Sequence, residues 1–183
     1  MFFLSISFIM AACNSKKRNQ TQVAQMNFNV ADSLLGDVIS DTTKRFFMKT
    51  PKWFDKTLIA KEQQTEIKKA GLKLVYSSQS KNTGSAFVVL DLNKLNDSLF
   101  NQYNSYLKKS LEQNKQYKKF GIDTFYSNNI LFIQYFSLSD SSVNLKLLTT
   151  NYLKGHYEID FSIPSYAYNS QSKMVESVLG SIK

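Results

Sequence analysis

The sequence is poor in the residue types that build most catalytic, metal and cofactor sites. Its 183 residues include one histidine, one cysteine, six glycines and two prolines. One cysteine excludes an internal disulfide and any cysteine-rich metal site. There is no Gly-rich phosphate loop, HExxH motif or Ser-His-Asp candidate set. Acid–base chemistry would depend on scattered carboxylates such as Asp91 or Asp123, so we predict no enzyme, no cofactor and no metal.

Arginine is also scarce, although the formal net charge is +9. Of 23 basic residues, only Arg18 and Arg45 are arginine, the side chain best suited to bidentate contacts with phosphate and guanine. Lysine supplies the rest, together with abundant Asn, Ile, Phe and Tyr, a mixture that an A/T-rich genome produces without selection for a ligand. We expect a basic, solvated surface and no nucleic-acid partner.

A short apolar run opens the chain. Phe2 to Ala12 is too short to span a bilayer and has the length of a signal-peptide core. It ends at Met10-Ala11-Ala12-Cys13, which resembles the lipobox of bacterial lipoproteins, where small residues admit the peptidase and the thiol takes the diacylglyceryl group. The resemblance implies removal of residues 1–12 and lipidation of Cys13. The alternative is a buried free cysteine behind a short hydrophobic segment.

Residues 13–27 read as a lipidated cysteine followed by a polar tether without an apolar period. Lys16, Lys17 and Arg18 would each add about 1 kcal/mol of attraction to anionic headgroups, or would simply solubilise the linker. No acidic run follows Cys13, and this favours a cell-envelope protein that faces the periplasm. The sequence leaves inner and outer membrane open.

Residues 28–183 are expected to form a single α+β domain, because 43% hydrophobic residues can fill one core. Four runs rich in β-branched and aromatic residues follow one another with short turns between them, which indicates an antiparallel meander. The runs are Ile122–Tyr126, Ile130–Leu138, Val143–Thr150 and His156–Ile163.

The chain before and after the meander supplies the other predicted elements. Asn27 to Ile39 is expected as a short helix or an irregular arm, and 45–49 as a first strand that Pro51 stops. The remaining elements are a helix near 56–70 ended by Gly71, a hairpin of Leu72–Ser78 and Ala86–Leu92, a long helix from about 94 to 118 with a stripe of Leu95, Leu99, Tyr103, Tyr106, Leu107 and Leu111, and a closing helix over Ser170–Ile182.

A few residues are candidates for contact with a ligand or partner. Trp53, the only tryptophan, could line a ligand cleft, but a tryptophan beside a strand end more often caps the core. Lys108, Lys109 and Lys115 form either a solvated face or a docking patch for an acidic partner. The tripeptides starting at Asp32 and Asp97, Asp-Ser-Leu in both cases, resemble an O-glycosylation acceptor of some Gram-negative bacteria; whether Asp32-Ser33-Leu34 or Asp97-Ser98-Leu99 is modified stays open.

The last strand gives the sharpest structural prediction. His156, Glu158 and Asp160 alternate with apolar residues and share one face, but residues two apart lie about 6.6 Å apart, too far to converge on one metal ion. A turn centred on 152–154 places Lys146 opposite Asp160 and Leu147 opposite Ile159. We expect the Lys146–Asp160 pair to be exposed and worth well under 1 kcal/mol, by the usual ~0–1 kcal/mol for surface pairs.

The order of elements resembles the PsbP-like α/β/α sandwich over roughly Arg45 to Lys183. The features are an aromatic first strand followed by Trp53, a long helix before the meander, and the ending HYEIDFSIPSYAYNSQSKMVESVLGSIK, in which a strand runs through a proline turn into a short helix. The resemblance implies a mainly antiparallel sheet with helices on both faces. The alternative is a cystatin-like curved sheet with one long helix.

Members of the family it resembles are mostly non-enzymatic assembly or binding modules. The predicted function is therefore a membrane-anchored lipoprotein that binds an envelope protein partner. Two alternatives stay open: a small-ligand carrier with an apolar pocket near Trp53, and a hydrolase with carboxylates converging in a cleft. The oligomeric state is not predicted.

Overall fold

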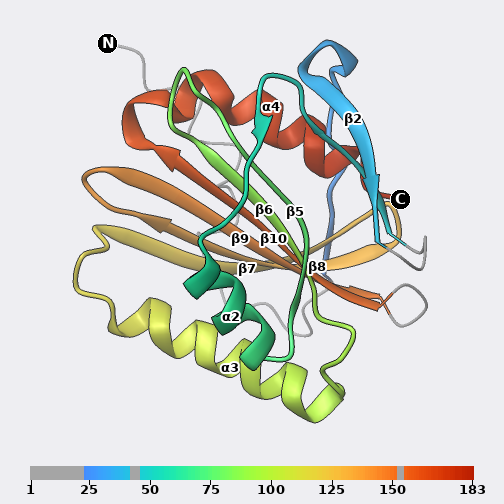
Figure 1. The fold of residues 1–183 in the computed structure, drawn as a ribbon, viewed down its shortest axis with the longest axis vertical. Helices are drawn as coiled ribbons and strands as arrows, with labels where there is room; N and C mark the ends of the chain where they lie inside the picture. The colour runs from blue at the N-terminus through green and yellow to red at the C-terminus, as the bar shows by residue number, and fades with distance from the viewer. Residues whose placement is uncertain (1–22, 42–45, 152–154) are drawn as a thin grey trace.

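The computed structural model describes residues 23–41, 46–151 and 155–183 (Figure 1). The strands are β1 (Ala24–Gln25), β2 (Leu35–Ser40), β3 (Phe47–Pro51), β4 (Asp55–Lys56), β5 (Lys73–Gln79), β6 (Ala86–Asp91), β7 (Lys119–Ser127), β8 (Ile130–Leu138), β9 (Ser142–Asn151) and β10 (Gly155–Pro164). The helices are α2 (Lys61–Lys69), α3 (Asp97–Gln113) and α4 (Tyr168–Gly180), with short 3-10 turns η1 (Asp32–Leu34) and η2 (Ser165–Ala167).

One large sheet organises the molecule. Its strand order is β1-β7-β8-β9-β10-β6-β5-β4, and every neighbouring pair is antiparallel except β1–β7, which is parallel. The strands β7 to β10 follow each other in sequence and in space, so the predicted meander is confirmed. β2 and β3 form a separate two-stranded sheet.

The predicted register of the last hairpin is confirmed. Lys146 pairs with Asp160 and Leu147 with Ile159. Alternation along β10 sends its apolar side chains, including Ile159, into a core that α4 and the β2–β3 sheet close. Its polar side chains turn to the other face, where α3 packs.

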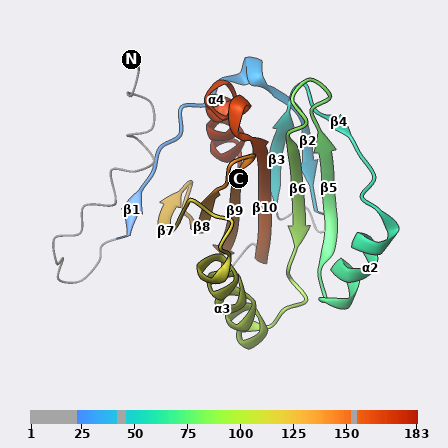
Figure 2. The ribbon, with the colours of Figure 1, turned by 90° about the vertical axis from the view of Figure 1, so that its left-hand side faces the viewer.

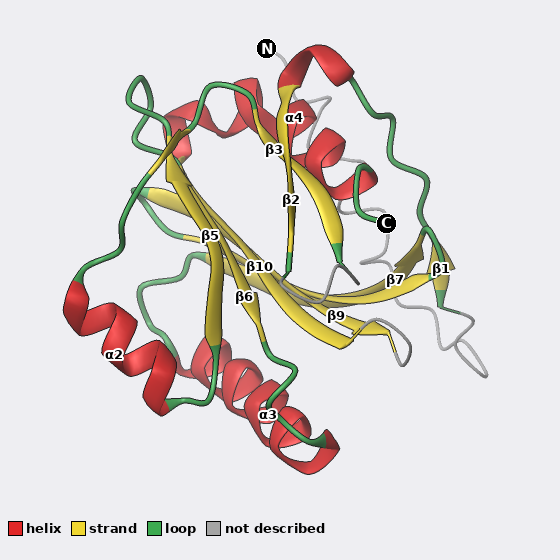
Figure 3. Ribbon diagram, turned by 45° about the vertical axis from the view of Figure 1, so that its right-hand side comes forward, coloured by secondary structure: helices red, strands yellow, loops and turns green. Residues whose placement is uncertain are grey.

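Helices cover both faces of the sheet, as predicted. Figure 1 shows α4 on one side and α3 on the other, and Figure 3 shows β2 and β3 beside α4 in front of the main sheet. The α4 face buries Met174, Val178 and Ile182 against the sheet, whereas the α3 face buries Phe100 and Leu111. The fold is therefore α+β, with a mainly antiparallel sheet between helical layers.

Three local predictions are wrong. Leu35–Ser40, expected within a helix or irregular arm, is strand β2, because pairing with β3 outweighs weak local propensity. Trp53 does not cap the core: it lies in the turn after β3 with 61% of its surface exposed, and the Lys52 ammonium sits 5.7 Å from its ring centroid. The stripe of the long helix is wrong in part: Phe100 is buried, while Leu99 and Tyr106 are exposed. Its other predicted members pack towards the sheet: Leu95, Tyr103, Leu107 and Leu111.

Two of the helices, α2 and α3, are also shorter than predicted. The helix expected near 56–70 begins only at Lys61, and Leu58 stays exposed before it. It ends as predicted at Gly71, whose φ of +76° suits glycine. α3 begins after Asn96, whose side chain accepts a hydrogen bond from the Leu99 amide at 2.9 Å, and ends at Gln113 instead of near 118.

The chain enters the sheet at its β7 edge. Ala24 and Gln25, inside the stretch expected to be tether, pair with Phe125 and Tyr126. Cys13 and residues 1–12 lie outside the described part of the chain. Within the described ranges, no helix is long and apolar enough to cross a membrane.

Candidate functional site

A charged cluster lies between α3 and the sheet. The Lys146 ammonium is 2.7 Å from Asp160 Oδ2 and also contacts Glu158 Oε1. Tyr103, on α3, donates its hydroxyl to Glu158 Oε2 at 2.6 Å. Glu158 is only 1% exposed. Burial of a carboxylate without hydrogen-bond or charged partners would destabilise the fold, and Lys146 and Tyr103 supply these partners. The Lys146–Asp160 pair is therefore not the isolated surface pair that the sequence predicted.

Burial sets the protonation of this cluster. It raises the pKa of Asp160 to about 8, against the opposing effect of Lys146 and with a further increase from Glu158. Burial alone would lower the pKa of Lys146, but Asp160 and Glu158 raise it above its usual value. Burial and then Glu158 raise the pKa of Tyr103 far above 10. The cluster therefore combines an aspartate of raised pKa with a lysine whose own pKa is raised.

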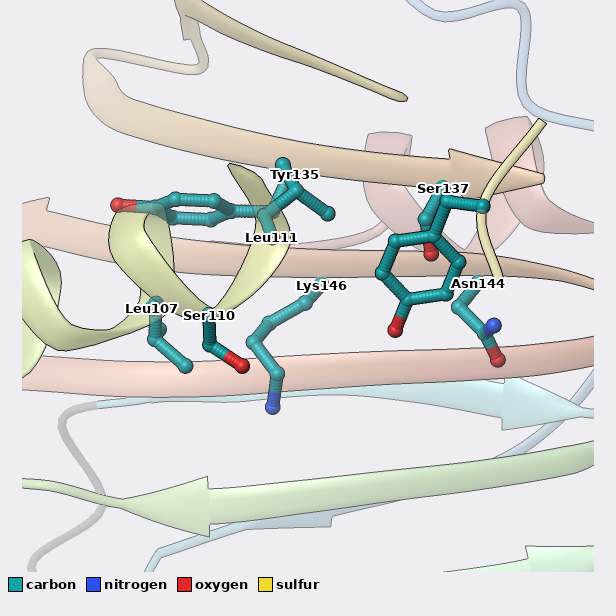
Figure 4. A pocket seen from close by; sticks show the side chains of 8 residues that line it. Leu107, Ser110, Leu111, Tyr135, Ser137, Asn144 and Lys146 are labelled. Atoms are coloured by element: carbon teal, nitrogen blue, oxygen red, sulfur yellow. The ribbon is translucent and has the colours of Figure 1, made fainter. Parts of the chain in front are cut away.

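A small pocket of about 100 Å³ opens beside the cluster. Figure 4 shows the Lys146 side chain extending from the sheet towards the α3 residues Leu107 and Ser110, with Tyr135, Ser137 and Asn144 around it. The Tyr135 hydroxyl donates to the Asn104 carbonyl at 3.2 Å, and burial raises its pKa to about 12.

The groups at this pocket are not activated for catalysis. A lysine acts as a nucleophile when its pKa falls, whereas that of Lys146 is raised and both neighbouring carboxylates hold the ammonium. Tyr103 is likewise far from forming a phenolate at neutral pH. The cluster orients α3 on the sheet and fixes the polar face of β10, which is a structural role.

A larger open groove of about 470 Å³ lies at the other end of the sheet. Three strands line it: β2, β4 and β5. The lining residues are Asp37, Val38, Ile39, Ser40, Phe54, Asp55, Lys56, Val75 and Tyr76. The lining mixes apolar and polar side chains. Asp37 has no ion-pair partner among the described residues, whereas Asp55 pairs with Lys81 at 3.1 Å.

Unpaired strand edges border this groove. β2 pairs with β3 alone among the described strands. β4 reaches β5 only at Ser78 and Gln79, so Tyr76 has a strand partner, Val89, on one side only. The register of β5 against β6 shifts between Leu74 and Tyr76, a β-bulge, and regular pairing resumes at Tyr76. Such edges carry free backbone donors and acceptors.

Exposed apolar side chains flank the groove. Val38 lines it and is 61% exposed. Trp53 directly precedes the lining residue Phe54, and Leu58 follows β4 by two residues. Trp53 is thus a predicted contact residue that the structure places beside a groove, although the side chain does not line the groove itself.

The other sequence candidates lie elsewhere. Lys108 and Lys109 are exposed on α3, and Lys115 is exposed in the loop after it, on the opposite face of the sheet from the β2–β3 sheet. Asp91 and Asp123 stand on β6 and β7, which β8, β9 and β10 separate, so they do not converge. The described residues hold no group of three His, Cys, Asp or Glu side chains that could bind a metal ion.

Sequence reasoning missed the groove and half of the cluster. The groove depends on β2, whose signal was short: the β-branched pair Val38-Ile39 between Gly36 and Asp41. The cluster was closer to being found, since Lys146 and Asp160 were placed opposite each other and Glu158 on the same face. The sequence did not predict that α3 would place the Tyr103 hydroxyl in contact with Glu158.

Comparison with known proteins adds one similarity. No protein-family model matches the chain, and no curated protein does. Among solved structures, the chain is similar to the solution structure of cyanobacterial PsbP (CyanoP) from Synechocystis sp. PCC 6803, with a TM-score of 0.47 and 11% sequence identity. The similarity covers 80% of this chain and 91% of that chain.

Proposed function

We propose that the protein is a lipid-anchored envelope protein that binds a partner protein, and that an extended segment of this partner occupies the groove between β2, β4 and β5. The observation that supports the proposal most is that unpaired edges of β2 and β5 border the groove. An extended peptide can take up the free backbone groups of such an edge while alternate side chains enter neighbouring pockets.

The chemistry of the groove defines the segment that fits it. Val38, Ile39 and Phe54 favour apolar side chains at alternate positions of the incoming strand. Asp37, which has no ion-pair partner among the described residues, favours a basic residue near one end. Trp53 adds a large exposed aromatic surface at the rim, and tryptophan is enriched among residues that dominate binding energy.

A small-molecule carrier is the second candidate, because the groove volume of about 470 Å³ would hold a ligand. Carrier sites are mostly apolar and enclosed, whereas this groove is open and Asp37, Ser40, Asp55 and Lys56 line it. A hydrolase has less support, since both carboxylates of the α3 cluster are held by Lys146. A partner protein suits the groove better than either.

The binding proposal is tested by quantitative capture from native envelopes. Val38→Arg places a charge in the groove at a position already 61% exposed, so folding should be retained. Leu99→Arg is the matched control, because Leu99 is 45% exposed on α3, away from the groove. A partner recovered with wild type and Leu99→Arg but lost with Val38→Arg supports the proposal. Equal recovery with all three proteins, or a co-purifying small molecule in its place, contradicts it.

The anchor is tested separately. Cys13 is expected to become the lipidated first residue of the mature protein, and burial of ~0.8 kcal/mol per methylene makes two or three acyl chains a durable anchor. Metabolic palmitate labelling of wild type against Cys13→Ser measures this directly. Equal labelling of the two proteins would contradict the lipoprotein assignment and would leave the groove proposal unaffected.

A further inference from the structure

The strand β7, which only the two-residue strand β1 flanks on its outer side, carries an exposed apolar strip. Phe120, Ile122 and Tyr126 are 46%, 39% and 38% exposed, respectively. They alternate with Phe125, which is buried in the core on the α4 side, so the strip lies on the α3 side of the sheet. α3 covers the neighbouring β8 residue Tyr135 but leaves the β7 strip open.

Lysines adjoin one end of this strip. Lys115 is exposed and has no ion pair among the described residues, and the exposed Lys118, two residues before Phe120, pairs with Asp140. Asp123 stands two residues before Phe125 and therefore belongs to the opposite face of β7. Aromatic and aliphatic side chains bordered by lysine are the composition of surfaces that lie in the interface of an anionic bilayer.

The N-terminal segment that leads to the proposed lipid anchor starts close to this strip. β1 pairs with β7 at Phe125 and Tyr126, so the segment leading back to Cys13 starts beside the strand that carries the strip. Val23 follows Cys13 by ten positions, which bounds the distance between the two residues at about 34 Å for a fully extended chain and at about 17 Å for a flexible coil. A lipid anchor on so short a segment would hold the β7 edge close to the headgroups.

We propose that the β7 strip of Phe120, Ile122 and Tyr126, with Lys115 and Lys118 beyond its end, rests on the anionic bilayer that holds the lipid anchor. The inference rests on the proposed anchor and adds an orientation to it. The sheet order puts β7 near one edge and β4–β5 at the other, and Figure 2 shows the two edges on opposite sides of the molecule. With β7 on the membrane, the groove faces away from it.

Tryptophan quenching by brominated lipids measures this contact. The lipidated protein, purified from envelopes in a Trp53→Phe background, carries a single tryptophan through Ile122→Trp, or through Val38→Trp as the matched control in the groove. Each variant is reconstituted into phosphatidylethanolamine–phosphatidylglycerol vesicles with brominated acyl chains. An interfacial residue lies within about 5–10 Å of the acyl boundary, so Ile122→Trp should lose most of its emission and Val38→Trp little.

The outcomes separate the strip from the anchor. A palmitate-labelled protein whose Ile122→Trp emission matches that of Val38→Trp would overturn the orientation and leave the anchor standing. Failure to incorporate palmitate would remove the anchor and, with it, the orientation. In a third outcome, the Ile122→Trp side chain is inaccessible to a water-soluble quencher in native envelopes, yet brominated lipids do not quench it in the vesicles. This result would assign the strip to a protein partner and would also overturn the proposal. Replacing Phe120 and Ile122 by serine should reduce quenching of a Tyr126→Trp reporter.

Discussion

Lys146 is the residue on which the α3 face depends. Its ammonium bridges Asp160 and the almost fully buried Glu158, and Tyr103 completes the partners of Glu158. A buried charge that loses its partner is far more costly than an exposed one. The cluster also explains why a lysine near a pocket is a poor candidate nucleophile here, because its neighbours keep it protonated.

Removal of this ammonium should destabilise the fold strongly. We expect Lys146→Met to lower the free energy of unfolding by about 3–5 kcal/mol, because Glu158 is left buried without a counter-charge. Urea unfolding followed by circular dichroism measures the change. Lys69→Met is the control: its partner is Glu66 in an exposed pair, and a change below about 1 kcal/mol is expected. Similar small losses in both variants would show that Glu158 finds another partner.

Asp160 should make stability depend on pH. Its pKa is about 8 in the fold and about 3.9 in an unfolded chain, so the folded state binds the proton more tightly. The stabilisation is complete below about pH 4 and is lost as the pH rises towards 8. Wild type should therefore lose stability between pH 5 and 8, although the 29% exposure of the side chain moderates the loss.

The Asp160→Asn variant isolates this group, since the amide cannot ionise. Its stability should vary less with pH than that of wild type over the same interval, as measured by urea midpoints at each pH. Parallel pH profiles for the two proteins would show that Asp160 is already ionised in the fold at pH 5.

At the scale of elements, α3 is held by a cap at its N-terminus and by two buried side chains. Asn96 caps its N-terminus through the hydrogen bond to the Leu99 amide, and Phe100 and Leu111 anchor its buried face. Phe100 also stacks on the His156 ring, with centroids 4.1 Å apart, which uses the only histidine as a packing surface on β10.

Loss of this cap should cost about 1 kcal/mol, the usual effect of replacing asparagine at this position by alanine. Asn96→Ala should therefore lower the thermal midpoint by a few degrees, whereas Asn101→Ala, at an exposed position inside the same helix, should leave it nearly unchanged. Equal shifts in both variants would mean that the hydrogen bond to Leu99 contributes no net stability. Differential scanning calorimetry resolves the two cases.

The elements that the sequence predicts best are those with strong periodicity. β10 alternates over its whole length, and its hairpin with β9 has a short turn, so pattern and turn together set the register down to Lys146 opposite Asp160. The sequence does not predict β2, because its six residues include a glycine and only two β-branched side chains. Its pairing with β3 depends on tertiary packing. Since the groove is built on β2, the best candidate site could not be predicted either.

At the scale of the whole molecule, the sheet separates two surfaces. The β7 edge carries the chain towards Cys13 and presents an apolar strip, and the β4–β5 edge with β2 presents the groove (Figure 2). Between them, α3 and α4 cover the faces of the sheet. A protein built in this way can stand on a bilayer at one edge and offer unpaired strands at the other.

Site-specific photocrosslinking in living cells tests the central claim, that the groove holds a partner protein. A photoreactive amino acid at Val38 or Tyr76 should give one discrete, higher-mass protein adduct, because both residues line the groove. The same probe at Leu99, exposed on α3, should give none. Adducts of equal yield from Leu99 and Val38, or no protein adduct from either groove position, would contradict the account.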